Sequence, residues 1–141
     1  MAERDDVTVP EILSINNPKA IPTAIRVLRE HGIIVFPTDT IYGIAADVFS
    51  TIGINKIYKV KQRPKDKALP VLIGDLAQLD SLVQPISQKT HRIIKSFWPG
   101  PLTVIMLKSL KIPRNSHHTQ PLVSGCQTWH LRCNYCGKLD P

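Results

Sequence analysis

Two short polar segments of this chain carry side chains that suit the binding of a small polar substrate and a phosphate. The first is the loop Pro37–Gly43, which directly follows the apolar run Ile33–Phe36. The hydroxyl groups of Thr38 and Thr40 suit the carboxylate or amine of an amino acid, and Tyr42 can line the pocket. Ligands of open α/β sheets commonly sit off strand ends, so we expect this loop to contribute to a substrate site.

The same loop also has a purely local interpretation. Short polar residues at a strand end usually satisfy their own backbone through hydroxyl and Asx turns. Taken alone, Thr38, Asp39 and Thr40 favour that local role. The ligand interpretation gains weight because a proline, a tyrosine and a glycine fix the path of the loop.

The second segment is the cationic stretch Lys61–Lys67. It begins roughly twenty residues after the first, a spacing that suits one intervening helix. Arg63 offers a planar fork for phosphate oxygens, whereas Lys61 and Lys67 supply compact positive charges. A solvated helix face and loop explain the same charges equally well. The chain has no Walker loop and no Gly-x-Gly-x-x-Gly segment, so side chains and local amides must hold any ATP.

The composition describes one ordinary globular domain. The chain has 141 residues, of which 43% are hydrophobic, and this length suffices for a real core. Apolar runs stay below the roughly 18 residues that a membrane helix needs. The acidic start Met1–Asp6 lacks the apolar region of a secretory signal, so we expect a cytoplasmic protein without a membrane partner. The net charge of +7 favours anionic partners such as nucleotides or RNA.

Apolar periodicity predicts the elements that must position the two segments. Helices are expected from the Asn17 cap to a C′ glycine at Gly32, from Ser50 or Thr51 to before Pro64, over 75–83, and from Ser87 to Trp98. Strands are expected over 33–36, 41–48, 69–73 and 102–107, with Gly43 marking a bend or a close backbone approach. This alternation predicts an α/β fold with a largely buried sheet.

Two helical spacings and the turn after the second helix predict which side chains face the core. The residues expected to point inward are Ile54, Ile57 and Tyr58 in one helix, Ile93, Ile94 and Phe97 in another, and Trp98 at the rigid turn that follows.

The character of the chain changes after Lys108. Residues 109–141 hold all three cysteines and three of the five histidines. The apolar residues here are too scattered to predict a core element; they are Leu110, Ile112, Leu122 and Val123. A Cys3His zinc set is present in Cys126, His130, Cys133 and Cys136. Its first pair is loosely spaced, so the favoured interpretation is a tail without metal.

Four ordered segments together resemble the YrdC/TsaC family of threonylcarbamoyl-adenylate synthases. They are Phe36–Gly43, Lys61–Pro64, Leu69–Ile73 and Trp98–Thr103. The resemblance implies an α/β fold with a twisted, mixed sheet around a positively charged cavity. It also implies a nucleotidyltransferase that converts L-threonine, bicarbonate and ATP into threonylcarbamoyl-adenylate and pyrophosphate, with Mg²⁺ expected on the phosphates.

The resemblance also implies roles for individual residues. Thr40 lies where the family contacts threonine, with Thr38 and Tyr42 beside it as further substrate-binding candidates. Arg63 and Lys67 lie where the family contacts ATP, and Lys61 and Arg63 match its Lys-x-Arg motif, which makes them the catalytic candidates. The product serves tRNA threonylcarbamoyladenosine modification, so tRNA and other tRNA-modification proteins are the implied partners.

The resemblance ends near Lys108. The Thr-x-x-x-Arg and Ser-x-Asn segments that come next in the family are not found, and Asn115-Ser116 has the reverse order. We therefore expect a flexible lead-in over 1–11, a partial family domain over 12–108 and a divergent tail over 109–141. Exposed apolar sheet edges and loss of catalysis are the two resulting hypotheses. The alternative function is a double-stranded RNA or tRNA-binding module without catalysis, which the basic charge would also suit.

Overall fold

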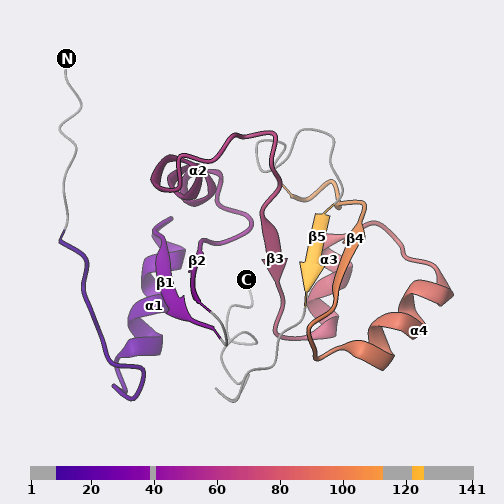
Figure 1. Cartoon of the computed structure of the whole chain (residues 1–141), viewed down its shortest axis with the longest axis horizontal. Coiled ribbons are helices and arrows are strands. Elements are labelled where there is room, and N and C mark those ends of the chain that lie inside the picture. Colours follow the sequence, from indigo (N-terminus) through magenta and orange to yellow (C-terminus); the bar gives the residue numbers. More distant parts are fainter. Residues whose placement is uncertain (1–8, 39–40, 113–121, 126–141) are drawn as a thin grey trace.

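The computed structural model describes residues 9–38 and 41–112, together with the backbone of 122–125. Helices and strands alternate along most of the chain, as expected for an α/β fold (Figure 1). The helices are α1 (Ala20–Arg29), α2 (Thr51–Val60), the 3-10 turn η1 (Leu76–Gln78), α3 (Leu79–Leu82) and α4 (Gln88–Phe97). The strands are β1 (Ile34–Pro37), β2 (Tyr42–Ala45), β3 (Pro70–Leu72), β4 (Thr103–Met106) and β5 (Leu122–Gly125).

The described strands form two sheets. β1 and β2 make an antiparallel hairpin, whose register places Phe36 opposite Gly43. The second sheet has the order β3-β5-β4, with β5 parallel to β3 and antiparallel to β4. The mixed character implied by the resemblance is therefore confirmed, but the strands divide between two separately hydrogen-bonded sheets. In Figure 1, the hairpin lies with α1 and α2, and the three-stranded sheet lies with α3 and α4.

β5 corrects the expectation that the chain has no core element after Lys108. Its backbone lies in the centre of the second sheet, where Val123 is paired with Pro70 on one side and Ile105 on the other. Ile112 is also buried, whereas Leu110 is exposed. The sequence pattern fails here because a strand of four residues is specified mainly by its neighbours in the sheet. The domain boundary at 108 remains a prediction.

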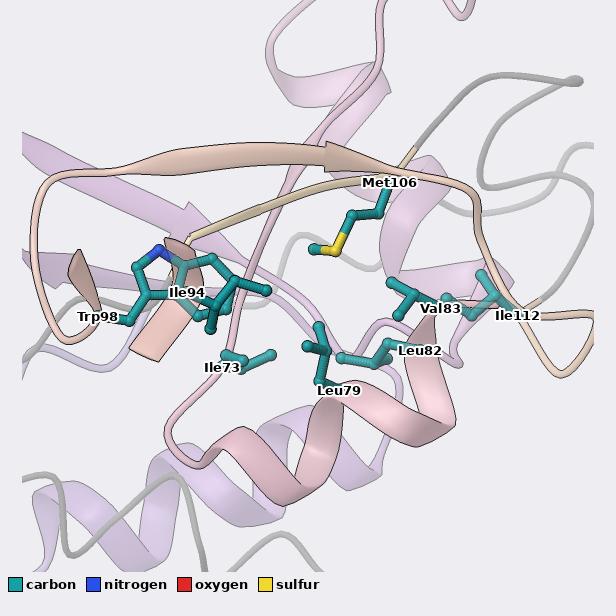
Figure 2. Packing of buried hydrophobic residues seen from close by; sticks show 8 residues of the cluster. All are labelled: Ile73, Leu79, Leu82, Val83, Ile94, Trp98, Met106 and Ile112. Atoms are coloured by element: carbon teal, nitrogen blue, oxygen red, sulfur yellow. The ribbon is translucent and has the colours of Figure 1, made fainter. Parts of the chain in front are cut away.

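The main core lies between the three-stranded sheet and the helices beside it. It consists of the eight residues Ile73, Leu79, Leu82, Val83, Ile94, Trp98, Met106 and Ile112 (Figure 2). Burial along β4 alternates: Met106 is buried, and Ile105 remains 65% exposed. One face of this strand therefore packs on the core, as the period of two predicts.

α4 buries a narrower stripe than its sequence predicts. Ile94 is buried, but Ile93 and Phe97 are exposed, so the expectation that all three face inward is wrong for two of them. Ile94 is the one buried residue of α4 in the part of the chain that the structure describes, so only one side of this helix is covered. Trp98 is buried as expected, and its Nε1 donates to the Leu102 carbonyl over 2.7 Å.

Serine side chains begin two of the helices, as predicted. Ser50 Oγ accepts the Gly53 N–H at 3.0 Å at the start of α2, and Ser87 Oγ accepts the Thr90 N–H at 3.2 Å at the start of α4. α1 differs, because it begins at Ala20 rather than directly after Asn17. The Asn17 side chain instead accepts the Lys19 N–H in the preceding turn.

The end of α1 shows why Gly32 is needed. The left-handed residue after this helix is His31, with φ of 59°, and not Gly32 as predicted. The His31 N–H bonds to the Leu28 carbonyl and the Gly32 N–H to the Val27 carbonyl, which is the Schellman pattern. A Cβ on Gly32 would lie 2.5 Å from Val27 Cγ1 and 2.7 Å from the Val27 oxygen. Close approach, rather than a positive φ, therefore explains this glycine.

None of the helices that the structure describes combines the length and the hydropathy needed to cross a bilayer.

The contact at Gly32 leads to a stability prediction. Gly32→Ala should lower the free energy of unfolding by about 2 kcal/mol, because the new methyl group meets a backbone oxygen that cannot move without disturbing the end of α1. Urea denaturation measures this loss as a lower midpoint at an unchanged slope. A midpoint equal to that of the unmodified chain would show that the end of α1 is not closely packed.

Candidate functional site

The loop after β1 is a closed hairpin turn. The Thr38 N–H donates to the Ile41 carbonyl over 3.1 Å, and the Thr38 hydroxyl bonds to the same oxygen. The Ile41 N–H in turn donates to Thr38 Oγ1 over 3.2 Å. The hydroxyl of Thr38 therefore serves its own turn, as the local interpretation predicts. Asp39 and Thr40 lie outside the described residues, so the assignment of Thr40 to threonine stays a prediction.

The start of β2 combines an exposed aromatic ring with a close backbone approach. Tyr42 is 74% exposed beside the turn. Gly43 lies opposite Phe36, and a Cβ on Gly43 would come within 2.9 Å of the Phe36 ring. The interpretation of Gly43 as a site of close approach is therefore confirmed.

The cationic stretch begins where α2 ends. The Gln62 N–H bonds to the Lys59 carbonyl and the Arg63 N–H to the Tyr58 carbonyl, so this helix also ends in a Schellman pattern. Gln62 adopts a φ of 47°, which turns the chain before Pro64, as expected. The lysines of the stretch are exposed, and Arg63 is half-buried.

The Arg63 side chain holds the loop that follows it. Its Nη2 donates to the Ala68 carbonyl over 2.9 Å, and its Nε donates to the Lys67 carbonyl over 3.3 Å. The Lys67 N–H closes the loop by donating to the Pro64 carbonyl. A guanidinium has five N–H donors, so these two bonds leave others that can reach a phosphate. Arg63 therefore has a structural task that its sequence position did not predict.

Tyr58 is the residue of this network that the sequence analysis did not assign to the site. Its hydroxyl donates to the same Lys67 carbonyl over 2.9 Å, and the residue is only 4% exposed. Burial raises the pKa of Tyr58; the Arg63 charge lowers that pKa and the Asp66 charge raises it. The phenol is thus a stable donor at neutral pH. The sequence contained one signal for this contact. Tyr58 was predicted to point into the core, and a buried tyrosine hydroxyl usually has a hydrogen-bond partner.

The structure does not bring the two polar segments together. In Figure 1, the β1–β2 turn lies at the bottom of the hairpin, whereas the connection from α2 to β3 crosses the top. Thr38 and Tyr42 belong to the first, and Lys61, Arg63 and Lys67 to the second. The chain therefore presents a cationic loop and a separate polar turn.

Two open grooves lie away from both segments. One, of about 350 Å³, is lined by Asp80, Val83, Gln84, Pro85, Ile86 and His91. The other, of about 300 Å³, is lined by Ile15, Asn16, Asn17, Pro18, Ile21, Pro22 and Ile25.

The residues that the structure describes contain no group of three or more histidines, cysteines and carboxylates suited to a metal ion. The four residues of the zinc set lie outside the described ranges.

Comparison with known proteins gives a consistent result. The family model for Sua5, YciO and YrdC proteins, described as "Telomere recombination", matches residues 26–125. A threonylcarbamoyl-AMP synthase of Bacillus subtilis is 43% identical over 100 residues, which are 71% of this chain and 29% of that protein. One of Pyrococcus abyssi is 37% identical over 87 residues, which are 62% of this chain and 26% of that protein.

A solved structure is also similar. The crystal structure of P. abyssi Sua5 complexed with L-threonine superposes with a TM-score of 0.71 at 30% identity, covering 77% of this chain and 32% of that one. The chain thus spans less than a third of the length of each of these three proteins.

The raised pKa of Tyr58 predicts a change in stability at high pH. A tyrosine of the unfolded chain ionises near pH 10. The folded-state pKa is higher, so the contribution of Tyr58 is complete below about pH 10 and is lost as the pH rises through the folded-state value. Urea titrations across this range should show a steeper loss of stability in the unmodified chain than in Tyr58→Phe. Parallel pH profiles for the two proteins would contradict the assignment.

Proposed function

This chain belongs to the Sua5/YciO/YrdC family, and from that premise we propose that it works as a threonylcarbamoyl-AMP synthase whose cationic loop, residues 61–68, binds ATP. The observation that carries the proposal is the loop itself. Its fold is fixed by Tyr58 and Arg63, and its lysine side chains are exposed beside them. The 43% identity to a synthase supports the choice of reaction.

The proposed reaction forms a mixed anhydride. The amine of L-threonine adds to carbon dioxide derived from bicarbonate and loses a proton, which gives a carbamate. A carbamate oxygen attacks the α-phosphorus of ATP, the bond to the bridging oxygen of the β-phosphate breaks, and pyrophosphate leaves with that electron pair. The product, threonylcarbamoyl-adenylate, then supplies a group for tRNA modification.

The loop contributes charge to this reaction. Carbamate and triphosphate are both anions, so they repel each other unless fixed cations lie near the phosphates. Lys61 and Lys67 are exposed and supply such charge, and the free donors of Arg63 can add a hydrogen-bonded contact. Positioning of this kind lowers the barrier without covalent participation of the protein.

Magnesium enters this proposal only as part of the substrate. The described residues contain no cluster of carboxylates, histidines or cysteines that would hold the ion, so we assign it to the phosphates of ATP.

The threonine site rests on weaker support from the geometry. The similarity to Sua5 complexed with L-threonine favours threonine as the second substrate. The turn with Thr38 and Tyr42 lies at the far end of the hairpin from the cationic loop, however, so its position does not favour a joint site. Contact of threonine with Thr38, Thr40 and Tyr42 stays a prediction.

The charge of Lys61 provides the direct test of ATP binding. Lys61→Ala should weaken ATP binding by about ten-fold or more, since a charge-assisted contact to phosphate is lost while the backbone bonds of the turn remain. Isothermal titration calorimetry measures the affinity. Lys95→Ala is the matched control, because it removes another exposed lysine, near the end of α4. Arg63→Ala is less suitable, since it also releases the loop.

Turnover can be measured with the protein preparation used for calorimetry. Release of pyrophosphate should require L-threonine, bicarbonate and ATP together. A chain that binds ATP but releases no pyrophosphate would contradict the synthase activity and support the hypothesis that catalysis is lost. Equal ATP affinity in Lys61→Ala and Lys95→Ala would contradict the role of the loop. Salt-dependent binding of double-stranded RNA without any ATP binding would favour the alternative of an RNA-binding module.

A further inference from the structure

We propose that Tyr58 is a positioning residue for ATP binding, which acts through the Lys67 carbonyl to hold the cationic loop in its binding conformation. The proposal rests on the function proposed above. It extends that function to a residue that lies on the buried side of α2 and carries no charge.

Tyr58 is attached to the loop at two points. Its backbone carbonyl accepts the Arg63 N–H over 3.0 Å, and its hydroxyl donates to the Lys67 carbonyl over 2.9 Å. One residue therefore fixes both the beginning and the end of the turn. Arg63 reinforces the second point, because its Nε reaches the same Lys67 oxygen.

The anchor itself is firmly held. Tyr58 is buried in α2 beside Ile54 and Ile57, which are each only 6% exposed. The other end of α2 is capped by Ser50, a buried residue whose Oγ also lies 2.9 Å from His31 Nδ1. The hydroxyl of Tyr58 is thus presented to the loop from a packed helix rather than from a free side chain.

This anchoring affects how much conformational freedom the loop loses when ATP binds. The side chains of Lys61, Lys65 and Lys67 are exposed and belong to a turn with one left-handed residue. A loop that is already folded does not lose conformational freedom when the triphosphate binds, and a loop without its anchor does. Removing the hydroxyl of Tyr58 should therefore weaken ATP binding, although that hydroxyl faces a carbonyl and not the ligand.

Tyr58→Phe is the appropriate variant because it keeps the buried ring and removes only the donor. We expect ATP binding, measured by calorimetry, to weaken by about five-fold, the ratio that corresponds to one net hydrogen bond. Ser81→Ala is the matched control, since the Ser81 hydroxyl also donates to a backbone carbonyl, that of Gln78 over 2.7 Å, away from the loop. The control should bind ATP as the unmodified chain does.

A double-mutant cycle separates positioning from general destabilisation. In a Lys67→Met background, where the charge of the residue that Tyr58 anchors is already gone, Tyr58→Phe should cause a smaller further loss of affinity than in the unmodified chain. A general loss of stability would give the same loss in both backgrounds. Additive losses, or a loss that Ser81→Ala shares, would overturn the positioning role.

The two proposals fail in different ways. If the unmodified chain does not bind ATP, the proposed function fails and this inference fails with it. If the unmodified chain binds ATP and Tyr58→Phe binds it equally well, only the positioning role is overturned.

Discussion

The arrangement of this chain depends on one pair of hydrogen bonds. The Lys67 carbonyl accepts one from the Tyr58 hydroxyl and one from Arg63 Nε. The segment that carries it joins α2 to β3, and so joins the hairpin half of the structure to the three-stranded sheet. A carbonyl that accepts two bonds from fixed side chains restricts the path of its loop more than a single bond would. The position of the exposed lysines follows from that restriction.

The position of α2, which carries Tyr58, depends on contacts between the start of this helix and the segment that follows α1. A Cβ on Gly53 would lie 3.0 Å from Ala46 Cβ and 3.3 Å from the Gly32 oxygen, so the start of α2 approaches the segment after α1 closely. His31 adds a contact to Ser50, and Lys56 Nζ donates to the His31 carbonyl over 3.1 Å. Small residues and short polar contacts therefore set the position of α2, and α2 carries Tyr58.

Much of the fold could be predicted because it depends on local patterns. The serine caps of α2 and α4, the inward face of α2 and the end of that helix before Pro64 are all properties of a few adjacent residues. The errors have a different origin. β5 depends on strands more than fifteen residues away in the chain, and the exposure of Ile93 and Phe97 depends on what else packs against α4.

The candidate site shows the same division. The sequence indicated a cationic turn, and the structure contains one. The sequence did not indicate that Arg63 donates two hydrogen bonds to backbone carbonyl groups, or that Tyr58 donates to one of the same carbonyls. Every residue has a backbone carbonyl, so the type of the accepting residue does not reveal such a contact. The resemblance assigned the Thr38 turn and the cationic loop to the two substrates of one reaction, whereas the two segments lie at opposite ends of the hairpin.

The most direct test of the central claim, that the loop over 61–68 is a preformed phosphate site, is a crystal structure of this chain with a non-hydrolysable ATP analogue. We expect a triphosphate against Lys61, Arg63 and Lys67, with the bonds from Tyr58 and Arg63 to the Lys67 carbonyl unchanged. A triphosphate bound elsewhere, or a loop that abandons these bonds when the nucleotide binds, would contradict it.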